Sequence, residues 1–134
     1  MLRKLRHPYD NARGGVAIMI RNSIKHFIHS EVKTPIIQSI ALSIITKVGY
    51  ITIASIYCPP SESGEKVSQQ NFADYFSSLG DRFIVGGDFN AKNVKWGSSI
   101  TLTRGRALDR AACAIHADYA SSGNPTHYLP SRPG

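Results

Sequence analysis

The segment RFIVGGDFN at residues 82–90 decides how the rest of this chain is interpreted. Its first four residues are mostly apolar and β-prone, which predicts a buried strand. Gly86 and Gly87 then allow a tight turn and a close approach of the backbone to another group. Asp88 and Asn90 follow two residues apart, so in extended backbone both side chains leave the same face. The segment therefore predicts a strand that delivers a carboxylate and a carboxamide to one spot at its end.

A carboxylate beside a carboxamide suits the chemistry of phosphate esters. The Asp88 carboxylate can take a proton from water or help to hold a divalent cation, and the Asn90 amide can donate to a phosphate oxygen or orient that water. The alternative is a strand that ends in an ordinary Asp/Asn turn. These residues alone favour that alternative, so the assignment depends on the rest of the chain.

Composition limits the classes of protein to consider. A chain of 134 residues with 42% hydrophobic and 19% charged residues is typical of one globular domain, or most of one. The 16 Lys and Arg against 9 Asp and Glu give a formal charge of +7, which favours a polyanionic partner such as nucleic acid, although an anionic membrane surface also fits. No apolar run approaches the roughly 18 residues of a membrane-spanning helix. Cys58 and Cys113 lack metal-site spacing and are expected to be free thiols of an intracellular protein.

Apolar patterning predicts four strands. Residues 16–20 follow two glycines and are expected to form a strand buried on both faces, with little secondary structure before them. Residues 36–45 alternate between apolar and small polar side chains, which predicts a half-buried strand. Residues 50–57 are expected to pair with it as a hairpin, which the prolines at positions 59 and 60 end. The fourth strand is the one that begins at Phe83.

Two helices are expected on either side of the fourth strand. Ser68 is a suitable N-cap for a helix whose apolar face carries Phe72, Tyr75, Phe76 and Leu79. A second helix is expected from residue 105 or 106 to about residue 120, with an apolar face that includes Ile115 and Tyr119. Trp96 is expected to anchor the loop between them by packing. This order of elements predicts an α/β (α+β) fold, a mixed sheet with helices on its outer faces.

Taken in order, the motifs of this chain resemble the endonuclease domain of non-LTR retrotransposons, the jockey-like elements of animals in particular. That domain belongs to the exonuclease–endonuclease–phosphatase superfamily. The matching segments are GGVAI at 14–18, SIYCPPS at 55–61, FIVGGDFN at 83–90, WGS at 96–98, GR at 105–106 and PTHY at 125–128. Each motif alone is weak, and their order and spacing make the match specific. The resemblance implies an incomplete four-layer αββα sandwich.

The resemblance also implies an activity and a set of site residues. Family members cut one DNA strand with a divalent cation, usually Mg²⁺. Asp88 would activate the attacking water, Asn90 would orient it or stabilise the transition state, and both would be secondary metal ligands. Tyr57 would place its hydroxyl near the scissile phosphate, and Thr126 lies in a segment that in the family reaches the DNA.

Three arginines, Arg104, Arg106 and Arg110, put positive charge at the start of the second expected helix, where they are candidates for phosphate contact. Arg106, within the matching GR motif, is the candidate for DNA binding. A solvated helix face is an equally good interpretation of these three side chains.

Other residues of the family pattern have no counterpart here. The family domain begins with a strand that carries an Asn, followed by a Glu that holds the metal, and it ends with a second Asp and a Ser-Asp-His motif. The five histidines of this chain do not match that motif. Residues 1–134 are therefore expected to be a partial domain that lacks both terminal catalytic segments and the principal carboxylate ligand.

The expected function is that of a fragment of a Mg²⁺-dependent DNA endonuclease, within a parent protein that also carries a reverse transcriptase. The expected partner is DNA, the expected location is intracellular, and nuclear during action on DNA, and no membrane association is expected. By itself the 134-residue chain is expected not to nick DNA at a useful rate. The alternative is a catalytically inactive DNA-binding remnant or a relic open reading frame, and a phosphatase that acts on a soluble phosphoester is a third interpretation.

Overall fold

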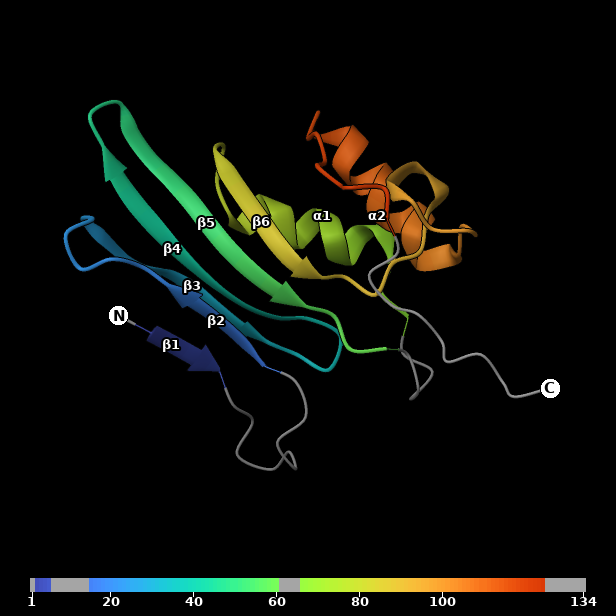
Figure 1. Cartoon of the computed structure of the whole chain (residues 1–134), viewed down its shortest axis with the longest axis horizontal. Coiled ribbons are helices and arrows are strands. Elements are labelled where there is room, and N and C mark those ends of the chain that lie inside the picture. The colour runs from blue at the N-terminus through green and yellow to red at the C-terminus, as the bar shows by residue number, and fades with distance from the viewer. Residues whose placement is uncertain (1, 6–14, 61–65, 125–134) are drawn as a thin grey trace.

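The computed structural model describes residues 2–5, 15–60 and 66–124. In chain order its elements are β1 (Leu2–Leu5), β2 (Val16–Met19), β3 (His26–Lys33), β4 (Gln38–Thr46), β5 (Gly49–Tyr57), α1 (Gln69–Ser78), β6 (Phe83–Asp88), the short 3₁₀ helix η1 (Val94–Trp96) and α2 (Thr103–Ala114) (Figure 1).

The main sheet has four strands in the order β3-β4-β5-β6. The first three form an antiparallel meander, and β6 lies parallel to β5. A parallel neighbour requires a crossover connection, and α1 lies in that connection. β1 and β2 pair with each other as a separate two-stranded antiparallel sheet. Because β5 and β6 run in the same direction, their last residues meet at one end of the sheet.

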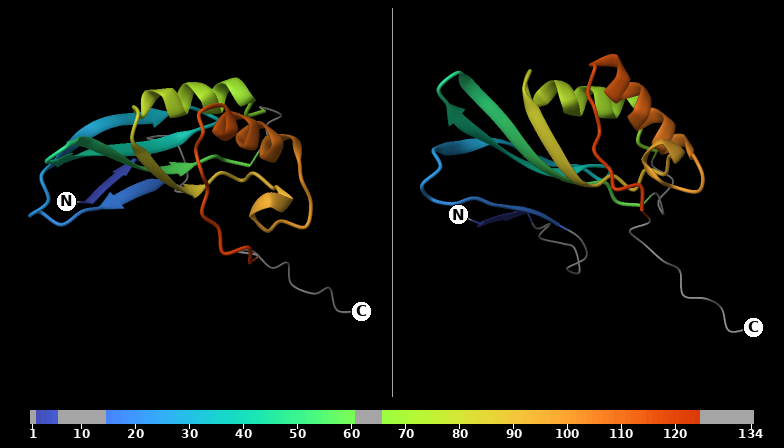
Figure 2. Two further views of the ribbon diagram at one scale, coloured as in Figure 1. Left: turned by 90° about the horizontal axis from the view of Figure 1, so that it is seen from above. Right: turned by 45° about the horizontal axis from the view of Figure 1, so that its top comes forward.

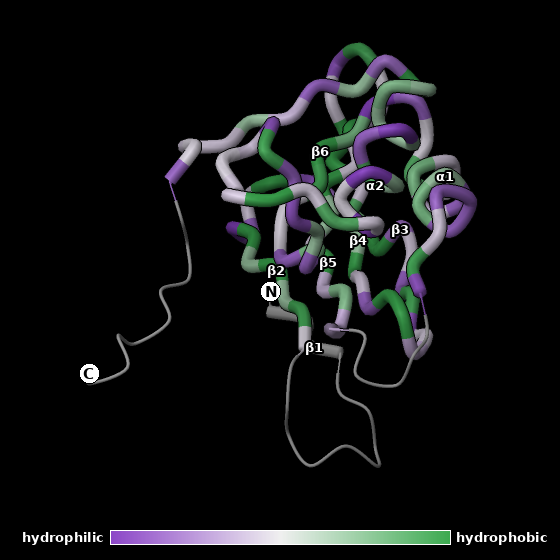
Figure 3. Tube along the Cα trace, turned by 90° about the vertical axis from the view of Figure 1, so that its right-hand side faces the viewer, coloured by the Kyte–Doolittle hydropathy of each residue, from purple (hydrophilic) through white to green (hydrophobic). Residues whose placement is uncertain are grey.

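The elements form layers around the main sheet (Figure 2). The two helices pack on one face, and the β1–β2 pair lies against the other. Thr52, Ala54 and Ile56 of β5 are buried on the helix face, whereas the residues between them are half-buried. In Figure 3 hydrophobic positions recur along the strands, while hydrophilic positions are interspersed along both helices. The predicted mixed α/β architecture is confirmed.

The helix predicted from Ser68 is confirmed as α1. The Ser68 side chain accepts a hydrogen bond from the backbone N–H of Asn71, and the Asn71 side chain accepts one from the backbone N–H of Ser68. Phe72, Tyr75 and Phe76 are buried against the sheet. The Tyr75 hydroxyl lies 2.6 Å from the Ser39 hydroxyl, and burial raises the pKa of Tyr75 to about 12.

Two predicted elements need correction. The strand at residues 16–20 was expected to be buried on both faces, but among the described strands β2 pairs with β1 alone, and Met19 is 82% exposed. The second helix was expected to reach residue 120 but ends at Ala114. His116 has a left-handed φ of 56°, and the chain then turns back, so Tyr119 packs on Trp96 instead of extending a helix face.

Two strands were not predicted from the sequence. β1 lies in a segment where little secondary structure was expected. β3 was missed because a register shift between Ile28 and Ser30 interrupts its alternation. At this bulge His29 hydrogen bonds to the Ser43 hydroxyl and to the Ser78 carbonyl, so a polar side chain ties β3 to the end of α1. The predicted hairpin is confirmed as β4–β5.

Candidate active site at the ends of β5 and β6

Tyr57 and Asp88 are the last residues of β5 and β6, and the register of the two strands pairs them directly. Paired residues of neighbouring strands share a face of the sheet, so both side chains leave the face away from the helices. Asp88 is exposed and Tyr57 is half-buried. A carboxylate and a phenol from segments far apart in the sequence thus lie side by side.

Close contact between the two strands depends on Gly87. It has φ 144°, and a Cβ built on it would lie 2.0 Å from the carbonyl oxygen of Ile56. A Cβ on Gly86 would meet nothing within 4 Å. The close approach of the backbone to another group, which was expected of the two glycines, therefore occurs between Gly87 and Ile56. It does not require Gly86.

Phe89 fixes the positions of its two neighbours, Asp88 and Asn90. Its ring lies 6.2 Å from that of Phe72 in α1, and the side chain packs on the edge of the hydrophobic core. Because Phe89 faces the helix layer, the preceding Asp88 faces the opposite side. This contact explains why an apolar residue stands between two polar ones in the motif.

Asn90 reaches the site through a turn. It was expected to share a face with Asp88 in extended backbone, but its φ is 47°, in the left-handed region that Asn tolerates better than most residues. Its backbone N–H donates to Oδ1 of Asp88 at 2.8 Å, and its Nδ2 donates to the carbonyl oxygen of Cys58 at 2.7 Å. The extended geometry was wrong, and an Asx-type turn brings the two residues together instead.

Cys58 links both strand ends and is fully buried. Its N–H donates to the carbonyl oxygen of Asp88 at 2.8 Å, and its own carbonyl accepts from Asn90. Burial raises the pKa of its thiol to about 12, with the Arg104 charge lowering it and the Asp88 charge raising it. The thiol stays protonated near neutral pH, so Cys58 acts here through its backbone and its packing.

The two arginines at the start of α2 differ in their contacts. Nη1 of Arg104 donates to the carbonyl oxygen of Pro59 at 2.9 Å, next to Cys58. Arg106, the sequence candidate for DNA binding, is exposed and its Nη1 lies 3.4 Å from the carbonyl oxygen of Thr101. In the described part of the chain no hydrogen bond or ion pair joins Arg106 to Tyr57 or Asp88.

The sequence of this chain matches known proteins along most of its length. Residues 51–131 match the family model described as endonuclease-reverse transcriptase. The chain belongs to this family. It is 34% identical over 119 residues to the probable RNA-directed DNA polymerase from transposon BS of Drosophila melanogaster, a match that covers 89% of the chain and 13% of that protein. It is also 34% identical over 122 residues to the RNA-directed DNA polymerase from mobile element jockey of Drosophila funebris, covering 91% of the chain and 13% of that protein.

A solved structure shares the fold. It is the endonuclease domain of TRAS1, a telomere-specific non-LTR retrotransposon, with a TM-score of 0.58 and 23% identity. The match covers 85% of this chain and 52% of the TRAS1 chain. The chain thus spans about half of one endonuclease domain and 13% of each reverse-transcriptase relative.

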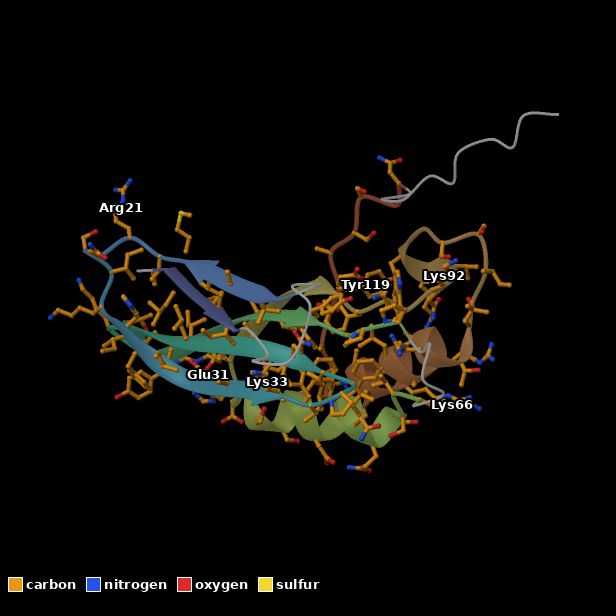
Figure 4. All side chains as sticks on the ribbon, turned by 90° about the horizontal axis from the view of Figure 1, so that it is seen from below. Arg21, Glu31, Lys33, Lys66, Lys92 and Tyr119 are labelled. Atoms are coloured by element: carbon orange, nitrogen blue, oxygen red, sulfur yellow. The ribbon has the colours of Figure 1, made fainter. Side chains whose placement is uncertain are left out.

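The loop after Asn90 is held by contacts that the family motifs do not reveal. Trp96 donates from Nε1 to the carbonyl oxygen of Ala91 at 2.8 Å, as expected of a packing residue. The Tyr119 ring lies edge-on at 5.5 Å from Trp96, and its hydroxyl donates to the carbonyl oxygen of Lys95. Figure 4 labels Tyr119 and Lys92 toward the same end of the molecule, far from Arg21. No sequence signal identified Tyr119 as a residue that holds this loop in place.

Oxygen atoms that could hold a divalent cation are few at the ends of β5 and β6. Asp88 offers a carboxylate, and Asn90 offers its amide oxygen, since its amide nitrogen donates to Cys58. Within the described residues no three His, Cys, Asp or Glu side chains lie together as a metal site. Thr126 lies outside the described residues, so its predicted contact with DNA stays a prediction. The donor set fits part of a Mg²⁺ site.

Proposed function

We propose that this chain carries part of the active site of a divalent-metal-dependent endonuclease that nicks one strand of DNA within a non-LTR retrotransposon reverse-transcriptase protein. The observation that carries the proposal is the direct pairing of Tyr57 with Asp88, with Asn90 tied to the same strand ends. Membership of the family and the formal charge of +7 support it.

Each of the three residues has a chemical role in this proposal. The exposed Asp88 carboxylate takes the proton of the attacking water as the water oxygen bonds to phosphorus, while the bond from phosphorus to the leaving oxygen of the strand breaks and that oxygen takes a proton from solvent. Asn90 uses one amide hydrogen on Cys58, so its second amide hydrogen and its oxygen are left to orient that water or contact a phosphate oxygen. The Tyr57 hydroxyl donates to a phosphate oxygen. Because backbone contacts hold these groups before substrate arrives, little reorganisation is needed during the reaction.

A divalent cation would be held here by the Asp88 carboxylate and the amide oxygen of Asn90. Both are hard oxygen ligands, which Mg²⁺ prefers, and Mg²⁺ in phosphoryl-transfer sites is completed by water and substrate oxygens. When bound, it would supply charge neutralisation at the phosphodiester. The proton transfer and the orientation of water and phosphate depend on Asp88, Asn90 and Tyr57.

A second candidate function is DNA binding without cleavage. It is favoured by the formal charge of +7, which suits a polyanionic partner whether or not cleavage follows. Catalytic groups act as a unit, and the loss of one commonly removes most of the rate. We expect the 134-residue chain to bind DNA but to nick it very slowly.

Relaxation of supercoiled plasmid with Mg²⁺ tests these proposals. The samples are the 134-residue chain and an extended chain, in which endonuclease residues of the jockey relative are added at both ends. We expect nicking by the extended chain that Asp88→Ala abolishes and that the charge-matched Asp118→Ala leaves intact, since Asp118 is exposed and lies beyond α2. DNA binding without Asp88-dependent nicking in either chain would favour the inactive remnant. A failure to bind DNA would remove both functions.

A further inference from the structure

We infer that Arg104 binds a phosphate of the DNA beside Tyr57 and Asp88, and that its hydrogen bond to Pro59 holds the guanidinium at this end of the sheet. The inference rests on the proposed function and adds a residue to the substrate contacts of the same site. The sequence left phosphate contact open for Arg104, Arg106 and Arg110 and favoured Arg106 for DNA binding, whereas the structure favours Arg104.

The residues at 57–59 connect Arg104 to the site. Tyr57 pairs with Asp88. The backbone N–H of Cys58 donates to the carbonyl oxygen of Asp88, and the carbonyl oxygen of Cys58 accepts from Nδ2 of Asn90. The next carbonyl, that of Pro59, accepts from Nη1 of Arg104 at 2.9 Å. The Arg104 guanidinium therefore contacts the residue that directly follows Cys58, and Cys58 is the residue that joins the ends of β5 and β6.

The position of Arg104 is also set by its helix. A Cβ built on the neighbouring Gly105 would lie 1.9 Å from the carbonyl oxygen of Lys92, so the start of α2 packs directly on the loop that follows Asn90. Nδ2 of Asn93 donates to the carbonyl oxygen of Gly105 at 3.2 Å, which adds a second tie between loop and helix. These backbone contacts make the first turn of α2 a rigid support for Arg104.

Within the described residues the ion pair found joins Lys95 to Asp109, and Arg104 has no carboxylate partner. Its positive charge is therefore available to an anion that approaches the site.

The chemistry of the side chain fits a phosphodiester. A guanidinium has five N–H donors in a planar fork, and the Pro59 carbonyl occupies one nitrogen. The other donors can contact the oxygens of one phosphate, which a guanidinium recognises better than an ammonium does. Arg106 and Arg110 lie on the same helix but are exposed, whereas Arg104 is half-buried.

Three substitutions on one helix separate a specific phosphate contact from a general effect of charge. Arg104→Met, Arg106→Met and Arg110→Met each remove one positive charge from the 134-residue chain. The affinity for a short DNA duplex is measured by fluorescence anisotropy between about 50 and 200 mM salt, without Mg²⁺. For Arg104→Met we expect roughly tenfold weaker binding and a loss of about 0.9 in the slope of log K against log salt. The other two variants should lose about twofold in affinity.

Arg104→Lys and Arg104→Gln distinguish phosphate binding from a structural tie. Lysine keeps the charge, so the salt slope should stay near that of the unsubstituted chain. Glutamine keeps an N–H donor without the charge, so its slope should fall like that of Arg104→Met. Equal effects of the three methionine substitutions, or an unchanged slope for Arg104→Gln, would overturn the inference. Its failure is separable from that of the endonuclease proposal, which depends on nicking that requires Asp88.

Discussion

The side-chain amide nitrogen of Asn90 lies 2.7 Å from the carbonyl oxygen of Cys58, at the point where β5 ends. Asn90 therefore joins two parallel strands in addition to any contact with substrate. Asn90, which its motif identifies as a catalytic candidate, is therefore also a structural residue. Its substitution should affect both stability and activity.

Asn90→Asp tests this connection. The replacement has nearly the same shape, but an acceptor would face the Cys58 carbonyl in place of a donor. We expect a loss of about 1–3 kcal/mol in the free energy of unfolding, measured by urea denaturation of the 134-residue chain. Asn124→Asp introduces the same charge at an exposed position and should change stability by less than about 0.5 kcal/mol. Similar losses in both variants would contradict the role of the hydrogen bond.

Tyr57→Phe tests the proposed phosphate contact. The ring and its packing remain while the hydroxyl is removed, so nicking by the extended chain should fall roughly 10²-fold with little change in stability. The control is Tyr50→Phe at the opposite end of β5, where Tyr50 is 58% exposed and packs edge-on against Phe27. Full activity of Tyr57→Phe would exclude the hydroxyl from the reaction.

The two glycines before Asp88 should respond differently to alanine. In Gly87→Ala the new Cβ would overlap the Ile56 carbonyl, at a positive φ that disfavours L side chains, so we expect a loss of about 3 kcal/mol or more. Gly86→Ala meets open space and should be neutral or stabilising by up to about 1 kcal/mol. Urea unfolding of both variants provides the comparison, and equal losses would show that β6 can move away from β5.

Cys58 should make stability fall at alkaline pH. Its pKa is raised in the folded chain from 9.0 to about 12, so the unfolded chain loses this proton first. The stabilising effect of the neutral thiol is complete below about pH 9 and is lost as pH rises toward 12. Between these values Cys58→Ala should weaken the decline in unfolding free energy by up to about 1.4 kcal/mol per pH unit. Tyr75 has a similarly raised pKa and remains in both proteins, so an unchanged decline would rule out Cys58 as a source.

The same burial predicts a difference in thiol reactivity. Cys58 is 0% exposed, whereas Cys113 on α2 is exposed. An alkylating reagent at about pH 8 should therefore modify Cys113 in the folded chain and Cys58 only after denaturant is added. Mass spectrometry of the peptides reads out both positions. Rapid labelling of Cys58 without denaturant would indicate that the ends of β5 and β6 open readily.

Elements with strong local signals could be predicted from the sequence. Ser68 and the aromatic spacing after it specify α1, and the alternation on both sides of Gly49 specifies the β4–β5 hairpin. Asp88 and Tyr57 were identified through the order of motifs, and their adjacency depends on the parallel register of β5 and β6.

Other features depend on contacts that local patterns do not encode. The bulge at His29 hides β3, and the left-handed turn at His116 follows the early end of the second helix and lets Tyr119 pack on Trp96. The turn at Asn90 depends on the Cys58 carbonyl, and the difference between Arg104 and Arg106 depends on which side chain reaches Pro59. Each of these outcomes joins residues distant in sequence, and propensity and periodicity describe only neighbours.

The parallel pairing of β5 with β6 has a consequence for how the chain folds. The meander of β3, β4 and β5 forms between adjacent segments, whereas β6 reaches β5 only after α1 has crossed over the sheet. Bringing distant segments together costs loop-closure entropy before their contacts contribute any stabilisation, so such contacts tend to form late. Tyr57 and Asp88 should therefore come together near the end of folding. Changes in α1 that slow its docking, such as those at Phe72 under Phe89, would delay assembly of the site although they touch none of its polar groups.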